Sequence, residues 1–374
     1  MLPMVMHFPS ALWPSLLALV VSGCATGLGP RAVRTERPTY NQQIVRSTDA
    51  EMLLNIVRLR YNDSPLFLEL SSVVSQYTYD ASVNASGNIA GSGPSSASVG
   101  GALGYSEKPT VTYAPLMGED FATRMLAPIP LDSIMLFQQS GWSAERLFLV
   151  AVQRVNDLLN APTASGPTPD HKPDYEAFAD FSERVHRLQS AGLLDLNWER
   201  REHETQPPGR NPRFRLRRPP EPQSPLAADV AAVRRYLDLK PGRDDFTLTA
   251  FPFERQPTEV GLRCRSLLGV LYFLSAAVEP PAPDVEAGLV MVTRDDDGQP
   301  FDWKKVTRKV LAIHSQKARP ERAYVAVAYR GWWFYVADDD QSSKATFSLV
   351  NILFSLQSAT GKGKSPLLTL PVGG

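Results

Sequence analysis

A strict alternation of apolar and polar residues over two neighbouring stretches most constrains the fold of this chain. Within 73–89 the odd positions are almost all apolar or aromatic and, beyond Val74, the even positions are polar. A segment rich in Gly and Ser follows at 90–96, and a weaker alternation occupies 97–113. A period of two is typical of strands with one apolar and one polar face. The pattern predicts a long β-hairpin over 73–113, with arms of roughly 15 residues, about 50 Å each.

Three interpretations of this hairpin are open. Its apolar face could pack on its own domain, or it could be a loosely structured arm, as its small residues near the tip suggest. Alternation over about ten residues is also typical of outer-membrane strands. One hairpin alone would leave unsatisfied edges in lipid, so this third interpretation requires an oligomeric pore to which each subunit donates two strands. The tyrosines would form a single aromatic girdle toward the base, at positions 77, 79, 105 and 113.

The N-terminus resembles a bacterial lipoprotein signal peptide. An apolar run at 11–21, too short to span a bilayer as a helix, is followed by Ser22-Gly23-Cys24. In this interpretation Cys24 carries a diacylglycerol and an N-acyl chain such as palmitate, and cleavage follows Gly23. No Lys or Arg precedes Cys24, although a positive charge is usual there. The competing interpretation is a buried N-terminal helix that ends in Gly-Cys.

These features predict a location in the cell envelope. We expect residues 1–23 to be the signal peptide and 24–46, with its Gly, Pro and polar residues, to be a tether. Ala25 after the cysteine, in place of Asp, resembles lipoproteins that are sent on to the outer membrane. We therefore expect a chain lipid-anchored in the bacterial outer membrane and facing the periplasm, with the membrane as its partner and a homo-oligomer as a further option.

Composition adds two constraints. Lys+Arg and Asp+Glu balance at 39 each, so no bulk charge favours nucleic acid as a partner. Cys264 is the only cysteine besides Cys24, and it lies in an apolar run at 260–277 that we predict to be a core helix. We expect Cys264 to be a small buried hydrophobe without a disulfide, because an acylated Cys24 leaves it no partner.

The predicted fold class is α+β. A first part, 47–203, holds a helix at 47–60, the hairpin, and a helical block at 121–126, 131–139, 143–159 and 174–191. A loop rich in Pro and Arg, 204–224, separates it from an α+β domain at 225–374, with short strands flanking the loop at 193–199 and 213–217. That domain should contain an antiparallel sheet with packing helices: helices at 225–239, 260–277 and 342–356, and strands at 246–250, 288–293, 309–314, 323–329, 332–337 and 367–371.

Catalytic motifs are scarce. The segment 358–365 resembles a phosphate loop but lacks the first Gly and follows a predicted helix. The acids at 295–297 lack the spacing of a calcium loop, so we expect no metal site and no cofactor besides the acyl chains. Two isolated carboxylates of a glycan-active hydrolase would leave no local signature.

One candidate ligand groove combines basic and aromatic residues: Lys309, Lys317, Arg319, Trp332 and Trp333. Such a surface could bind an anionic or sugar-containing ligand. The alternative is a charged sheet edge that discourages aggregation.

Three stretches resemble a family of uncharacterised proteobacterial lipoproteins: MLLNIVRLRYNDSPLFLELSS, KPTVTYAPLMGEDFATRMLAPIPLDSI and YRGWWFYVADDDQSSKATFSLV. The resemblance implies an envelope location and no catalytic residue. We therefore predict a structural, assembly or binding role without catalysis. The alternatives are an oligomeric outer-membrane pore or export component that uses the 73–113 hairpin, and a glycan-active hydrolase.

Overall fold

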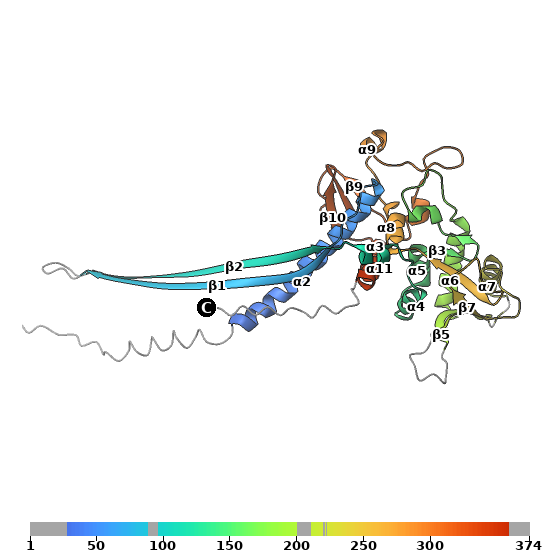
Figure 1. Ribbon diagram of the computed structural model, residues 1–374, viewed down its shortest axis with the longest axis horizontal. Helices are drawn as coiled ribbons and strands as arrows, with labels where there is room; N and C mark the ends of the chain where they lie inside the picture. Colours follow the sequence, from blue (N-terminus) through green and yellow to red (C-terminus); the bar gives the residue numbers. More distant parts are fainter. Residues whose placement is uncertain (1–27, 89–95, 200–210, 220, 222, 359–374) are drawn as a thin grey trace, which may run out of the picture. The chain divides into compact units, whose positions relative to one another are not determined.

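The computed structural model of the chain describes residues 28–88, 96–199, 211–219, 221 and 223–358 (Figure 1). The chain divides into two compact units, 1–52 and 53–374. Helices and mainly antiparallel sheets occur together, so the predicted α+β class is confirmed. Within these described ranges no helix is both long and apolar enough to cross a membrane.

The first unit is described only where it is helical. Helix α2 (Leu28–Arg60) starts in the first unit and ends in the second. Residues 28–46 of the expected tether are therefore helical. Pro30 lies in the first turn, where a missing N–H is tolerated, and Pro38 lies inside the helix. Cys24 and the predicted signal peptide lie outside the described residues.

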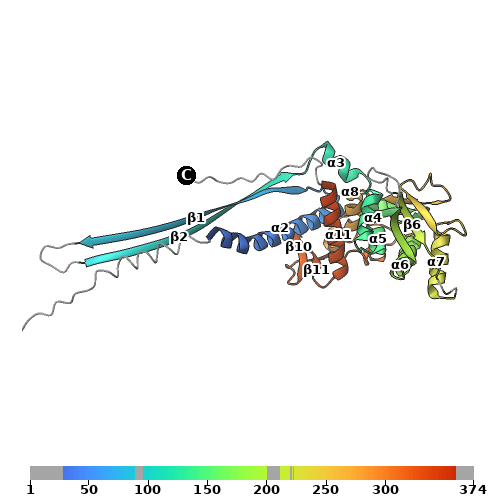
Figure 2. The same ribbon diagram turned by 90° about the horizontal axis from the view of Figure 1, so that it is seen from below.

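The predicted hairpin is confirmed as the two antiparallel strands β1 (Leu68–Asn88) and β2 (Ser96–Pro115). With 21 and 20 residues, they are longer than the alternation alone indicated. Figures 1 and 2 show the two strands side by side along their length.

The helical block follows the prediction except at one point. Helices α3 (Glu119–Leu126), α4 (Leu131–Gln139), α6 (Glu176–Ser190) and α7 (Pro225–Tyr236) lie where they were expected. The predicted helix 143–159 is wrong beyond Ala151, where α5 (Ala144–Ala151) gives way to strands β3 (Val152–Val155) and β4 (Leu158–Leu159). The carbonyls of Leu149 and Val150 accept hydrogen bonds from the Arg265 guanidinium, which closes the end of the helix.

A six-stranded sheet crosses the expected domain boundary. Its order is β4-β3-β8-β7-β6-β5, with β5 (Leu194–Glu199), β6 (Asn211–Leu216), β7 (Asp245–Thr249) and β8 (Glu259–Cys264). All neighbours are antiparallel except β7 and β8. Strand β6 falls inside the expected loop at 204–224, so the sheet includes strands from both sides of the expected domain boundary. Phe214 of β6 is buried and pairs with Leu196 and Phe246, which ties both halves of the chain into one core.

The described residues after Cys264 form a three-stranded sheet and four helices. Its strands lie in the order β10-β11-β9: β9 (His314–Gln316), β10 (Ala323–Tyr329) and β11 (Trp332–Ala337). The helices are α8 (Leu267–Ser275), α9 (Ala282–Glu286), α10 (Lys304–Thr307) and α11 (Gln341–Ser358). A 3₁₀ turn, η1 (Pro162–Ser165), lies earlier in the chain. Positive φ angles of 49° at Arg330 and 77° at Gly331 form the tight turn between β10 and β11.

Three predictions in this part are wrong. The helix expected at 260–277 begins at Leu267, because its first residues belong to β8 and Ser266 caps the helix by accepting from the Gly269 amide. The strand expected at 288–293 is absent from these described residues, and the Leu289 amide instead bonds back to Asp284 of α9. Of the strand expected at 309–314, only His314 lies in β9. The strand expected at 367–371 lies outside the described residues.

Candidate functional site

The register of the hairpin places odd-numbered positions of one strand opposite odd-numbered positions of the other. From Ser72, opposite Thr112, to Asn88, opposite Ser96, every odd position pairs with an odd position. Because successive residues of a strand alternate between faces, the odd positions of both strands share one face and the even positions share the other. An irregularity between Leu70 and Ser72 shifts this register only near the base. The alternation in the sequence therefore gives the paired strands two different faces.

The part of the hairpin nearer its turn, 79–88 and 96–105, which we call the tip half, has two contrasting faces. Its odd face carries Tyr79, Ala81, Val83, Ala85, Gly87, Ala97, Val99, Gly101, Leu103 and Tyr105. Its even face carries Asp80, Ser82, Asn84, Ser86, Asn88, Ser96, Ser98, Gly100, Ala102 and Gly104. The first set is apolar or aromatic, and the second is polar or small. Such an alternation is typical of outer-membrane strands, which lie between lipid and water.

Both outer edges of the hairpin lack a strand partner among the described residues, since β1 and β2 form a sheet of two strands. No described helix or other strand of the unit has an extended contact with it. An isolated two-stranded ribbon is marginally stable in water, and its open edges invite further strands. If the hairpin packed on its own domain, another element would cover one of its faces. No such element is present among the described residues.

The base of the hairpin is held by other residues of the second unit, to which the hairpin itself belongs. Asn55, fully buried in α2, donates to the carbonyl of Leu66 at 2.7 Å and accepts from its amide at 2.9 Å. The Leu116 amide donates to the Phe67 carbonyl at 2.9 Å, which closes the hairpin at its base. The Phe67 ring lies 4.9 Å from that of Phe354 in α11. The chain therefore enters and leaves the hairpin in a fixed geometry.

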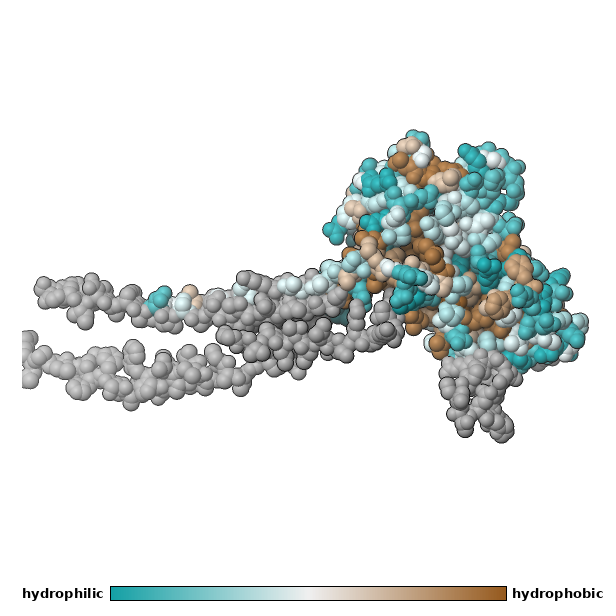
Figure 3. All heavy atoms as spheres, viewed as in Figure 1, coloured by the Kyte–Doolittle hydropathy of each residue, from teal (hydrophilic) through white to brown (hydrophobic). Residues whose placement is uncertain are grey.

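Exposed apolar side chains surround this base. We call Leu66, Leu68, Met117 and Leu126 the basal collar; Met117 is 69% exposed and Leu126 62%. Leu66, Met117 and Leu126 line an open cavity of about 270 Å³ whose other walls include Phe121. Figure 3 shows patches of hydrophobic surface among hydrophilic ones on the second unit. The sequence analysis missed the collar, because its members are far apart along the chain and belong to no periodic pattern.

The five residues of the predicted ligand groove do not form one site. The Lys317 ammonium lies 3.7 Å from the centre of the Trp332 ring, and the Arg319 guanidinium lies 5.3 Å from that of Trp333. Adjacent residues of a strand face opposite sides, so the two tryptophans of β11 do not share a surface. Lys309 instead forms ion pairs with Glu145 and Glu183 on α5 and α6.

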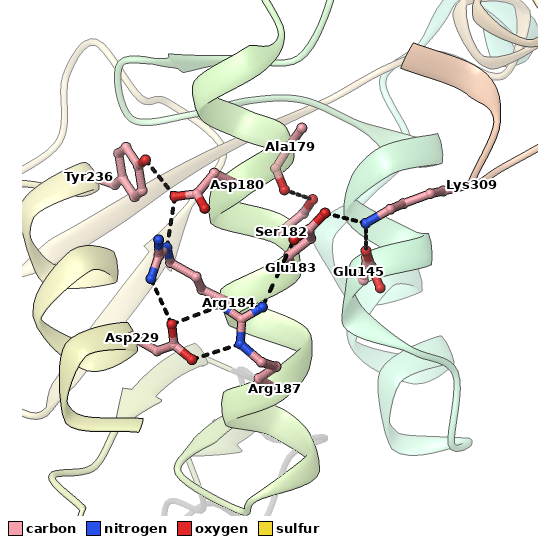
Figure 4. A network of polar contacts seen from close by, with 10 residues as sticks. All are labelled: Glu145, Ala179, Asp180, Ser182, Glu183, Arg184, Arg187, Asp229, Tyr236 and Lys309. Atoms are coloured by element: carbon pink, nitrogen blue, oxygen red, sulfur yellow. Dashed lines mark hydrogen bonds and ion pairs between the residues drawn. The ribbon is translucent and has the colours of Figure 1, made fainter. Parts of the chain in front are cut away.

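A network of ion pairs joins α6 to α7 (Figure 4). Asp229, only 6% exposed, accepts from Arg187 Nε and Nη2 at 2.8 Å and from Arg184 Nη1 at 2.7 Å. Arg184 Nε also donates to Asp180 at 2.7 Å, and the Tyr236 hydroxyl donates to the same carboxylate at 2.6 Å. The hydrogen bond from Arg187 lowers the pKa of Asp229, and that from Arg184 lowers the pKa of Asp180. Both carboxylates are thereby held in their charged form, which suits a structural role.

A hydrolase of the glycosidase type needs a general acid, which is a carboxyl group whose pKa is raised. Every carboxyl pKa shift found in the described part of the chain is downward: Asp63, Asp180, Asp229, Asp245 and Glu279. Within the same described residues, no cluster of His, Cys, Asp or Glu has the arrangement of a metal site.

The Asp229 network makes stability depend on acid pH. A carboxyl whose folded pKa is lowered adds stability above its unfolded pKa, about 3.9, and loses it as the pH falls through the folded value. We expect Asp229→Asn to lower the free energy of unfolding at pH 7 and to lose less on acidification to pH 3 than the parent chain. Urea unfolding followed by circular dichroism at both pH values measures this. Asp157→Asn, at an exposed carboxylate 3.8 Å from Arg255, is the control and should behave as the parent; equal acid sensitivity of all three chains would contradict the assignment.

Cys264 is buried as predicted, although it ends strand β8 and does not lie in a helix. It is 5% exposed and free of a disulfide, and burial raises the pKa of its thiol to about 12. Such a thiol is protonated at neutral pH and unreactive.

The residue after Cys264 was missed by the sequence analysis. Arg265 is 1% exposed and donates to Ser165 Oγ and to four backbone carbonyls: Leu149, Val150, Val152 and Asn160. Its guanidinium also stacks on Phe273 at 4.0 Å. Burial lowers its pKa to about 9, which still leaves it charged at neutral pH. Its position in an otherwise apolar run was the only signal, and the carbonyls that it serves could not be identified from sequence.

No protein-family model matches the chain, and neither a curated protein nor a solved structure is similar to it at a significant level. The class of protein is therefore defined by the fold and the hairpin alone. It is an α+β chain with an unusually long two-stranded hairpin within its second unit.

Proposed function

We propose that the chain is an outer-membrane lipoprotein, anchored through Cys24, whose β1–β2 hairpin supplies two strands to the wall of an oligomeric pore. The register of the hairpin carries this proposal, because it gives the tip half an apolar odd face and a polar even face. In a pore the odd face would meet lipid and the even face would line the water-filled interior.

Oligomerisation follows from the hydrogen bonds of the backbone. Lipid offers no partner to an open strand edge, and each unsatisfied group there costs several kcal/mol. The described hairpin has two open edges, so copies of it must pair edge to edge until the sheet closes. The lipid chains on Cys24 would confine the subunits to the membrane surface and raise their effective concentration there. The resemblance to lipoproteins supports the same location.

The basal collar would then lie between neighbouring subunits, because it surrounds the base of the strands that pair. We expect the double substitution of Met117→Asp and Leu126→Asp to weaken assembly by at least tenfold in the concentration needed for half-oligomerisation, since two carboxylates would be desolvated at the contact. Phe251→Asp, at a 66% exposed side chain outside the collar, is the matched control. Sedimentation of the full chains in detergent measures both; equal assembly of the two variants would remove the collar from the interface.

Conductance tests the function itself. Full-length lipidated chain added to planar bilayers should form stable channels. Asp80 lies on the even face of the tip half, so Asp80→Lys should shift the ion preference of the channels from cations toward anions. Asp120→Lys, at an exposed residue of α3 outside the hairpin, should leave this preference unchanged. Bilayers that stay silent with the intact oligomer would instead favour a structural or assembly role without a pore.

A further inference from the structure

We infer that the bilayer surface lies at the register pair Tyr79–Tyr105, so that only the tip half of the hairpin enters lipid. The remainder, 68–78 and 106–115, which we call the base half, would form a stretch of wall outside the membrane. This inference rests on the proposed function and defines the lipid-contacting part of the same site.

The length of the strands requires such a boundary. A membrane strand tilted by about 45° needs roughly 9–11 residues to cross the hydrocarbon core. β1 has 21 residues and β2 has 20, about twice that length. The hairpin cannot lie in lipid over its whole length, whereas the tip half alone has the required span.

The composition of the odd face changes at the same place. In the tip half the odd positions carry no charge. Immediately beyond Tyr105 the odd face carries Glu107, opposite Tyr77, and then Pro109, opposite Ser75. A charged residue on the lipid face is costly at depth and tolerated near the interface. Lipid contact therefore extends no further than Tyr105.

The even face also stops being uniformly polar or small beyond the Tyr79–Tyr105 pair. The base half pairs Gln76 with Lys108 and places Val74 opposite Thr110, so neither of its faces is consistently apolar. Such a ribbon suits water on both sides. The rest of the second unit would then stand off the bilayer by up to roughly 35 Å, the length of about eleven strand residues.

Tyr79 and Tyr105 suit the boundary chemically. They are direct register partners on the odd face, at the end of its apolar band. Tyrosine combines an apolar ring with a hydroxyl that needs a polar partner, and aromatic girdles mark the interfaces of outer-membrane strands. In a closed oligomer the same pair would recur in every subunit and form a continuous girdle.

Fluorescence quenching in proteoliposomes tests the boundary. Single cysteines at odd positions of the full lipidated chain are labelled with the environment-sensitive NBD fluorophore: Val83→Cys and Val99→Cys in the tip half, Val73→Cys and Val111→Cys in the base half. The native Cys264 thiol is buried and stays unlabelled. We expect brominated phosphatidylcholine to quench positions 83 and 99 at least threefold more than positions 73 and 111, and aqueous iodide to show the reverse order.

The outcomes separate the two proposals. Strong quenching by brominated lipid at all four positions would move the boundary toward the base and overturn this inference while leaving the pore intact. Quenching by iodide at all four positions, in an oligomer of unchanged mass, would overturn the membrane role of the hairpin and the proposed function with it. Even-position labels at Ser82→Cys and Ala102→Cys should be open to iodide and poorly quenched by the lipid.

Discussion

Val83→Arg should abolish insertion of the hairpin, whereas Ser82→Arg should be tolerated. The two positions are neighbours in the middle of the tip half, and each pairs with a small residue, Gly101 or Ala102. They lie on opposite faces, so one arginine would meet lipid and the other the pore interior. An arginine on the lipid face near the bilayer midplane costs about 2–4 kcal/mol, and every subunit would bear that cost.

Heat-resistant oligomer in the membrane fraction measures this contrast, with the total amount of each chain as the control for folding. We expect a loss of at least tenfold for Val83→Arg and less than twofold for Ser82→Arg. An equal loss for both would mean that the two faces of the ribbon are not in different media. Equal retention would mean that neither face meets lipid.

Arg265→Met should cause the largest loss of stability in the body of the protein. The guanidinium serves four backbone carbonyls and Ser165, and a buried polar group left unsatisfied costs about 1–3 kcal/mol. Because Asn160 Nδ2 also donates to the carbonyls of Leu149 and Val152, some of these acceptors keep a partner. We therefore expect a loss of about 3 kcal/mol or more in the free energy of unfolding.

Arg263→Met is the matched control, since Arg263 lies two residues earlier, in β8, and is exposed. It should change stability by less than about 0.5 kcal/mol. Arg265→Lys keeps the charge but places all of its fewer donors on one nitrogen in place of a planar fork, so it should recover only a minor part of the loss. Urea unfolding of the full chains measures all three. A stable Arg265→Met chain would show that the carbonyls at the end of α5 have other partners.

Local periodicity was enough to locate much of the fold. Helix α4 and strands β10 and β11 have the bounds that the sequence predicted, because their apolar pattern and their flanking Pro, Ser or Gly residues agree. The hairpin was located for the same reason. Its register places the apolar positions of both strands on one face. That register became known only from the pairing of the strands in the structure.

Elements that depend on distant partners were not predictable. The helix expected at 143–159 stops at Ala151 because β8 takes up Val152 as a strand partner and Arg265 caps the helix end. Both partners lie more than 100 residues further along the chain. Strand β6 was expected as 213–217 and only as a flank of the loop, although its pairing with β5 and β7 makes it part of the core.

The same distinction between local patterns and distant partners applies to the candidate sites. The ligand groove was inferred from residues close in sequence, and the structure separates them: Lys309 pairs with acids of α5 and α6, while Trp332 and Trp333 lie on opposite faces of β11. The basal collar is assembled from segments on both sides of the hairpin, so no local pattern identifies it. Cys24 lies outside the described residues, and its acylation remains a prediction.

Native mass spectrometry of the full chain, released from outer membranes in mild detergent, tests whether the chain is a lipid-anchored pore subunit. We expect one closed oligomer whose mass is a whole multiple of a chain that starts at Cys24 and carries its acyl groups. We also expect the hairpin, residues 68–115, to resist protease in membranes. A monomer with a protease-sensitive hairpin would contradict the pore.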